Sequence, residues 1–264
     1  MTTIGTTSGQ RTVHLIRHGE KNASTAAVDP NQLTEQGRRG ALAYGVALRG
    51  SPTLEVYCST DADGKAVDRS HDTGWYIHAG YAGLEYDAAN DLFRSDSSEK
   101  QRFVPGLEER LQQRVPDRLV KEYKAGRMTR AQAHEQCYRI VANPRAKDVD
   151  VAELRLLLDG THASFTALRY HLVERKYSQS LTVVLVGHDP NIGCLQQELQ
   201  PKATIEVLLP LHGIVATREQ TTLFPDLPPP NLLANRFRYS FISGGKNYEG
   251  ALFGDAPSFS QLLT

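Results

Sequence analysis

The amino-acid sequence predicts an α/β fold built on a mostly parallel central sheet. Short β-branched runs with strand character alternate along the chain with helix-forming segments, which is typical of this class. One run, Leu181 to Val186 (LTVVLV), is apolar throughout, as expected for a central strand that is covered on both faces. With 264 residues, the chain is long enough for one large domain with a well-buried core. We expect a single domain over residues 1–264.

The first half of the chain begins with two strands and two helices. Thr12 to Ile16 (TVHLI) predicts the first strand. A helix is expected after Thr34, whose hydroxyl suits an N-cap, and it ends before the turn residues Gly50-Ser51-Pro52. Leu54 to Cys58 (LEVYC) predicts the second strand, and a further helix is expected over about 67–79.

The middle of the chain changes in character. Residues from about 105 to 143 are highly charged and helix-forming (LEERLQQRV, RLVKEYKAG, RAQAHEQCYRIV), and they predict short helices with His134 and Glu135 on a solvated face. We expect a helical cap insertion over about 85–145. A long amphipathic helix is predicted over Asp150 to Lys176. Further strands are expected over 214–218 and 237–242, joined by a proline-rich loop.

Composition narrows the class of protein. Thirty basic residues balance thirty acidic ones, so nothing indicates nucleic acid or an anionic membrane surface as a partner. The three cysteines show no CxxC spacing, which predicts reduced thiols in a cytoplasmic protein. The N-terminus lacks the apolar stretch of a signal peptide, and no run approaches a membrane span. The sequence carries no signal about a homo-oligomer.

Two strands of the predicted sheet end in the same way. TVHLI leads into Arg17-His18-Gly19, and LTVVLV leads into Gly187-His188-Asp189. LEVYC ends toward the same edge at Ser59, and Arg69 follows shortly after it. In open α/β sheets, ligands bind beyond the carboxyl ends of the strands. The two histidines are therefore expected to face each other at that edge.

Two arginines and two histidines suit a doubly charged anion, and phosphate is the obvious candidate, since the arginine fork matches its oxygens. Phosphoryl transfer depends mainly on positioned cations, and one histidine can serve as the nucleophile. A nucleophilic imidazole must be neutral, and nearby guanidinium groups disfavour its protonation. Gly19 fits this scheme, because a side chain there would crowd an approaching phosphate.

With these motifs the sequence resembles the histidine phosphatase superfamily, also called phosphoglycerate mutase-like, and specifically its first branch. The resemblance implies a three-layer α/β/α sandwich with a helical cap. It also implies that His18 accepts the phosphoryl group, while Arg17, Arg69 and His188 complete the phosphate pocket. The residues that carry it, in family order, are Leu15-Ile16-Arg17-His18-Gly19-Glu20, Leu33-Thr34-x-x-Gly37, Ser59, Arg69-x-x-x-Thr73 and Val186-Gly187-His188-Asp189-Pro190.

The chain departs from the family pattern at the general acid. The first branch usually has Leu-x-Glu after the second arginine, and here the stretch is DLFRSD, Asp91 to Asp96. Asp96 is the preferred candidate and Asp91 also lies near. Asp189 is the other candidate, because the acid-phosphatase branch places its acid directly after the second histidine. A longer spacer before Arg69 is the second departure, and Arg69 is preferred over Lys65 because a bidentate grip needs a guanidinium.

These features predict a phosphatase that hydrolyses a phosphomonoester of a small metabolite through a phosphohistidine on His18. No metal and no cofactor are expected, since the arginines already neutralise the charge of the phosphate. Two alternatives stay open: a phosphoglycerate-type mutase, and a catalytically inactive module that binds a phosphorylated ligand. The sequence does not identify the phosphorylated substrate.

Overall fold

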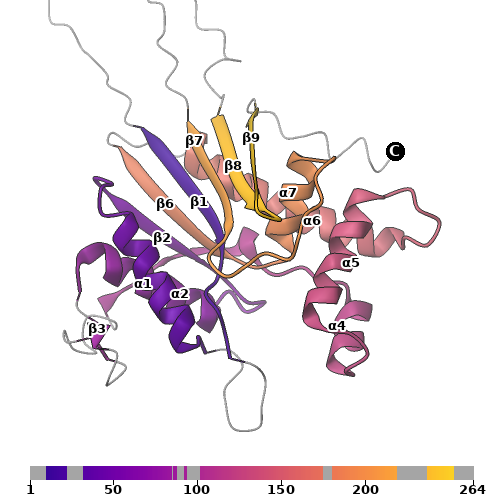
Figure 1. Cartoon of the computed structure of the whole chain (residues 1–264), viewed down its shortest axis with the longest axis horizontal. Helices are drawn as coiled ribbons and strands as arrows, with labels where there is room; N and C mark the ends of the chain where they lie inside the picture. Colours follow the sequence, from indigo (N-terminus) through magenta and orange to yellow (C-terminus); the bar gives the residue numbers. More distant parts are fainter. Residues whose placement is uncertain are drawn as a thin grey trace, which may run out of the picture.

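A seven-stranded mixed sheet forms the centre of the computed structural model, with strand order β5-β2-β6-β1-β7-β8-β9 (Figure 1). The structure describes residues 10–22, 32–84, 86–87, 92–93, 102–174, 180–218 and 237–252. The strands of this sheet are β1 (Arg11–Arg17), β2 (Leu54–Ser59), β5 (Gly106–Glu108), β6 (Leu181–Gly187), β7 (Gly213–Arg218), β8 (Phe237–Ser243) and β9 (Lys246–Leu252). A separate pair joins β3 (Tyr86–Asp87) to β4 (Leu92–Phe93).

The half of the sheet that carries the motifs is parallel. β5, β2, β6 and β1 run in one direction, and Arg17 at the end of β1 is paired with Gly187 at the end of β6. On the other side, β7, β8 and β9 are antiparallel. The α/β prediction is confirmed, and so are the strands expected near 214–218 and 237–242. The antiparallel half and the strand β9 extend the predicted sheet.

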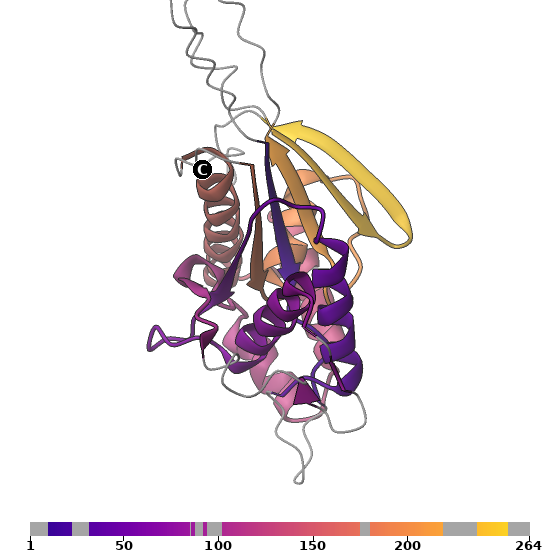
Figure 2. The same cartoon turned by 90° about the vertical axis from the view of Figure 1, so that its left-hand side faces the viewer.

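Helices cover both faces of the sheet, as a three-layer sandwich requires (Figures 1 and 2). The helices α1 and α2 pack together on one face, and α6 and α7 pack together on the other. A π-helical turn, Tyr170–Glu174, continues α6. The helices are α1 (Glu35–Ala47), α2 (Asp68–Ala82), α4 (Asp117–Lys124), α5 (Arg130–Ala142), α6 (Val151–Arg169) and α7 (Asn191–Leu199).

Alternating side chains of the central strands build two separate cores. Val13 and Leu15 of β1 belong to the core beneath α5, α6 and α7, whereas Ile16 belongs to the core beneath α1 and α2. In β6, Val184 joins Trp75 of α2 in that second core. Successive side chains of a strand point to opposite faces, and each large apolar side chain buried here contributes about 1.5–3 kcal/mol. A strand apolar throughout therefore lies between two helical layers.

In the region expected as an insertion, the first predicted helix is wrong. The stretch LEERLQQRV was expected to be helical, but Gly106–Glu108 is a strand that pairs in parallel with β2, and a single 3₁₀ turn, Glu109–Leu111, follows. Backbone pairing at the open edge of β2 and burial of Leu111 outweigh the local helix propensity. The other two segments form α4 and α5, and a capping box of Thr129 and Gln132 begins α5.

Two sequence predictions fall on residues that the structure does not describe: Asp96, with its neighbour Asp91, and the proline-rich loop at 224–231. Within the described ranges, none of the helices has the length and apolar character needed to cross a membrane.

The start of α1 is held against the loop that follows His18. Thr34 caps the helix by accepting the backbone N–H of Gly37 at 2.9 Å, and its own backbone N–H donates to the Glu20 carbonyl at 3.0 Å. The Thr34 hydroxyl also donates to the Glu20 carboxylate at 2.6 Å. A Cβ at Gly37 would overlap the Glu20 carbonyl oxygen. Glycine is therefore required where helix and loop meet, and Glu20 orients the loop.

We expect Gly37→Ala to lower the free energy of unfolding by about 1–3 kcal/mol, the usual cost of overpacking a well-packed contact. Urea denaturation measures this change. Gly50→Ala is the matched control, because a Cβ at Gly50 would have nothing within 4 Å. Equal stabilities for the two variants would show that the helix and the loop are not in close contact.

Candidate active site

The two histidines of the sequence motifs meet at one edge of the sheet. Pairing of β1 with β6 is continued by the His18 N–H, which donates to the Gly187 carbonyl at 3.2 Å. The His18 and His188 rings lie 5.4 Å apart between centroids, and both residues are only 1% exposed. The convergence expected from the two strand ends is therefore present in the structure.

A single hydrogen bond sets the tautomer of His18. Its Nδ1 lies 2.7 Å from the carbonyl oxygen of Gly19. A carbonyl oxygen only accepts, so Nδ1 carries the hydrogen and donates. The lone pair of the neutral ring is then on Nε2, which is the atom available for attack on an electrophile.

The environment of His18 keeps the ring neutral. Burial lowers the pKa of His18 well below its ordinary value of 6.5, and the neighbouring His188, Arg69 and Arg17 lower it further. The hydrogen bond to Gly19 acts in the opposite direction and is the weakest influence. At neutral pH the imidazole is therefore a base with a free electron pair, as a nucleophile must be.

His188 is positioned by two serines and one arginine. Its Nδ1 lies 3.5 Å from Nη2 of Arg69, and because a guanidinium only donates, Nδ1 accepts. Nε2 then carries the hydrogen and donates to Ser59 Oγ at 2.7 Å, and Ser59 in turn contacts Ser70 Oγ at 2.8 Å. Burial, followed by the charges of Arg69, Arg130 and Arg17, lowers the pKa of His188 well below 6.5.

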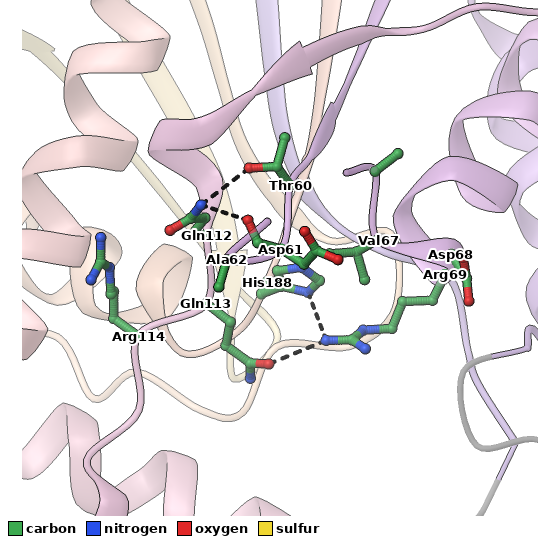
Figure 3. Close-up of a pocket in the computed structure, with 11 residues that line it drawn as sticks. Thr60, Asp61, Ala62, Val67, Asp68, Arg69, Gln112, Gln113, Arg114 and His188 are labelled. Carbon is green, nitrogen blue, oxygen red and sulfur yellow. Dashed lines mark hydrogen bonds between the residues drawn. The ribbon is translucent and has the colours of Figure 1, made fainter. Parts of the chain in front are cut away.

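Arg69 is the second residue of α2, and its side chain reaches across the mouth of the site (Figure 3). Besides His188, it contacts the Gln113 side-chain oxygen, to which it donates at 3.2 Å. Burial is the largest influence that lowers the pKa of Arg69, to about 10, with Arg130 the next. The guanidinium therefore stays charged at neutral pH, and the longer spacer before it is accommodated at the start of a helix.

The loop after β1 is joined to the start of α2. The Gly19 N–H donates to Thr73 Oγ1 at 2.9 Å, and that hydroxyl donates to the Arg69 carbonyl at 2.7 Å. A Cβ on Gly19 would meet the Gly37 carbonyl at 3.1 Å. The close approach found at Gly19 is therefore to α1, and the expectation that a side chain there would crowd a phosphate stays a prediction.

Arg17 is held at the end of β1 by the backbone on its other side. Its guanidinium donates to the carbonyl of Leu208, and its backbone N–H donates to the His212 carbonyl at 2.9 Å. The positive charge of Arg17 acts on His18, Arg69 and His188 alike, since it lowers the pKa of each. The structure thus brings Arg17, His18, Arg69 and His188 together.

A cavity of about 530 Å³ lies beside this cluster and is lined by two of its members, Arg69 and His188 (Figure 3). His188 and Arg69 lie on its floor and side, and Gln112 fixes the opposite wall by donating to Thr60 Oγ1 and to the Asp61 carbonyl. A smaller cavity of about 230 Å³ shares Gln113 with the first. The remaining residues around the larger cavity are Ala62, Ala66, Val67, Asp68, Gln113 and Arg114.

Asp189 follows His188 directly, but its carboxylate is occupied. His134 Nδ1 lies 2.9 Å from Asp189 Oδ2, and the Tyr138 hydroxyl donates to Oδ1. Asp189 and His134 are 1% and 3% exposed. The expectation of a solvated face at His134 is therefore wrong, because that side of α5 packs against the loop after β6. Asp96 lies outside the described residues.

Sequence reasoning missed three residues of the site: Gln113, Arg130 and Tyr138. Gln113 bridges two parts of the site, since it accepts from Arg69 and donates to the Asp189 carbonyl at 3.0 Å. No motif marks a glutamine within a charged segment. A usable signal existed for α5, because Arg130, His134 and Tyr138 recur every four residues and so share one helical face.

Among the described residues, no group of three or more histidine, cysteine, aspartate or glutamate side chains is arranged to hold a metal ion. All three cysteines are buried and free. The site offers a neutral imidazole with its lone pair on Nε2, a second imidazole beside it, and charged guanidinium groups, of which Arg69 lines the cavity. Such a site can bind an oxyanion and attack its central atom.

No family model matches the chain, and no curated protein matches it. Solved structures do. The mycobacterial glucosyl-3-phosphoglycerate phosphatase is 17% identical with a TM-score of 0.44, over 80% of this chain and 91% of that one. The phosphoglycerate mutase from Bacillus anthracis is 15% identical with a TM-score of 0.43, over 80% and 89%.

A protein histidine phosphatase SixA complexed with tungstate is 12% identical with a TM-score of 0.31, over 93% of this chain and 97% of that one. At such identities and scores the likeness carries no weight for activity, which has to be argued from the residues of this site.

The buried histidines predict a pH-dependent stability. In the unfolded chain their pKa is about 6.5, and in the folded chain it is lower. Below pH 6.5 the unfolded chain therefore binds more protons, and stability is lost as pH falls. Each such group contributes at most about 1.4 kcal/mol per pH unit. Urea denaturation from pH 8 to pH 5 should show a shallower loss for His18→Asn than for wild type. Parallel curves would contradict a depressed pKa at His18.

Proposed function

We propose that this chain is a member of the histidine phosphatase superfamily that hydrolyses a phosphomonoester of a small metabolite. The observation that carries the proposal is the state of His18: a buried ring whose Nδ1 hydrogen is tied to the Gly19 carbonyl, beside a second imidazole and two guanidinium groups. A site that only bound phosphate would need the cations but not a lone pair directed by a fixed tautomer.

The reaction proceeds in two steps. In the first, His18 Nε2 attacks phosphorus, the ester P–O bond breaks, and the leaving oxygen takes a proton from a carboxylic acid. In the second, water attacks the phosphorus of the phosphohistidine and gives a proton to the same carboxylate, the P–N bond breaks with its electron pair returning to His18 Nε2, and inorganic phosphate leaves. Arg17 and Arg69 bind the equatorial oxygens throughout and stabilise the charge that is spread over them. The positive charge of these two arginines neutralises the phosphoryl oxygens, which is the role of metal ions in other phosphoryl-transfer sites.

Asp96 is the residue to which we assign the general acid, on the sequence alone. Asp189 is the less suitable candidate, because both of its oxygens accept hydrogen bonds from α5. A carboxylate held in this way cannot exchange a proton with a leaving group unless those contacts break. The contacts that Asp189 makes with described residues favour a structural role for its carboxylate over the role of general acid.

Two other functions use the same cluster. A mutase would return the phosphoryl group to a second hydroxyl of the substrate, and the formation of an isomer from a phosphoglycerate would reveal it. An inactive module would bind phosphate without turnover. The neutral, directed His18 favours catalysis over the module, and the absence of the Glu-Arg-His-Tyr-Gly run of glycolytic mutases favours hydrolysis over transfer.

Wild-type protein should release phosphate from p-nitrophenyl phosphate between pH 5 and pH 8, in the presence of EDTA. His18→Ala should lower kcat by about a thousandfold or more, because the covalent route is lost. Acid-labile, base-stable labelling of the protein by a phosphorylated substrate should disappear with it. His162→Ala, an exposed histidine on α6, is the control. Equal rates for wild type and His18→Ala would exclude this mechanism.

The identity of the general acid can be tested by comparing substrates whose leaving groups differ in their need for a proton. Asp96→Asn should lower kcat by about 10²–10⁴-fold for sugar phosphates, whose alkoxide needs a proton, and far less for p-nitrophenyl phosphate, whose phenolate leaves unaided. Asp189→Asn should show no such dependence on the leaving group. The reverse pattern would transfer the role of the acid to Asp189.

A further inference from the structure

One face of α5 points at the candidate active site and carries three polar side chains. Arg130, His134 and Tyr138 are spaced four residues apart, so they lie in one row along the helix. The opposite face of α5 carries the exposed Arg139. None of these three side chains takes part in the proposed two-step reaction.

His134 and Tyr138, the second and third members of the row, both contact the carboxylate of Asp189. His134 Nδ1 contacts one carboxylate oxygen at 2.9 Å, and the Tyr138 hydroxyl donates to the other. All three side chains are buried. A buried carboxylate is costly unless donors satisfy it, and these two donors come from one helix. α5 is therefore fastened to the residue that follows His188.

The first member of the row, Arg130, has no hydrogen-bond or ion-pair partner among the described residues. It lines the smaller cavity with Gln113 and His134. Among the described residues, burial and the charge of Arg17 lower the pKa of Arg130, while the carboxylate of Asp189 acts on it through space and raises it. The charge of Arg130 itself lowers the pKa of Arg69 and of His188.

A partly buried guanidinium with no ion pair, surrounded by other cations, is unfavourable until an anion arrives. Arg130 and Arg17 each lower the pKa of Arg69, and Arg17 lowers that of Arg130, so the three guanidinium groups repel one another. The carboxylate of Asp189 offsets part of this repulsion, yet it is bound to His134 and Tyr138 and gives Arg130 no direct contact. A bound oxyanion would satisfy all three guanidinium groups at once.

We propose that Arg130 is a third guanidinium of the phosphate site, and that Asp189 is the anchor which, through His134 and Tyr138, positions α5 and thereby Arg130. The inference deepens the proposed function and rests on the same anion site. It gives Asp189 a positioning role instead of the role of general acid. It also makes the expected insertion a part of the site.

The role of Arg130 is tested by calorimetric titration with tungstate and with inorganic phosphate, both analogues of the transferred phosphoryl group. Arg130→Gln should weaken the binding of both by about tenfold or more, the effect of losing a charge-assisted hydrogen bond. Arg139→Gln makes the same change of charge on the opposite face of α5, nine residues and about two and a half turns away. Equal weakening in the two variants would overturn the assignment of Arg130.

The anchor is tested by a double-mutant cycle. Tyr138→Phe removes one donor to Asp189 and keeps the ring that packs on Gly193. If Tyr138 acts through Arg130, the variant binds tungstate several-fold more weakly, and combining it with Arg130→Gln causes no further loss. Independent, multiplying losses would overturn the positioning role. His134→Asn provides a second break of the anchor should Tyr138→Phe prove too unstable, with thermal unfolding as the check.

Titration separates this inference from the proposed function, because it requires no turnover. Selective loss of tungstate binding in Arg130→Gln, with no hydrolysis by the wild type, would support the third guanidinium and reject the phosphatase. Hydrolysis by the wild type with unchanged binding in Arg130→Gln would keep the phosphatase and reject the inference. Failure of the wild type to bind tungstate at all would reject the inference.

Discussion

Parallel pairing of β1 with β6 is the constraint on which the site depends. Because Arg17 lies opposite Gly187 in the register, the next residue of each strand is a histidine, and the two rings meet 5.4 Å apart. A slip of one residue would send one ring to the other face of the sheet. Apolar side chains on both faces of both strands hold the register, so the two packed cores also secure the chemistry.

The site concentrates positive charge around two imidazoles that burial keeps neutral. Gathering positive charges in this way is electrostatically unfavourable in the empty protein. Hydrogen bonds with neutral groups hold the side chains in position. Ser59 orients His188, the Gly19 carbonyl orients His18, and Gln113 holds Arg69. Each of these groups is neutral, so none competes with an anionic ligand for the guanidinium charges. A cluster of this charge is suited to binding an anionic ligand.

The region between β5 and α5 contributes to the site as well as covering it. β5 extends the parallel edge of the sheet, Gln112 and Gln113 form the wall of the larger cavity, and α5 is bound to Asp189. The same region was the hardest to interpret from sequence. Its charged, helix-forming composition describes the segments α4 and α5 well, but strand pairing at an open edge decided the conformation of Gly106–Glu108.

Local pattern determined a good deal about this protein. Three features could be predicted from the sequence: the buried strand β6, the helix cap at Thr34 and the two histidines that follow strands. Strand burial, helix capping and strand ends each leave a signature within a few neighbouring residues. Tertiary structure alone decided that Gly19 packs on α1, that Gln113 bridges Arg69 and Asp189, and that His134 is buried. These depend on contacts between segments 18 to 76 positions apart along the chain, for which no local propensity exists.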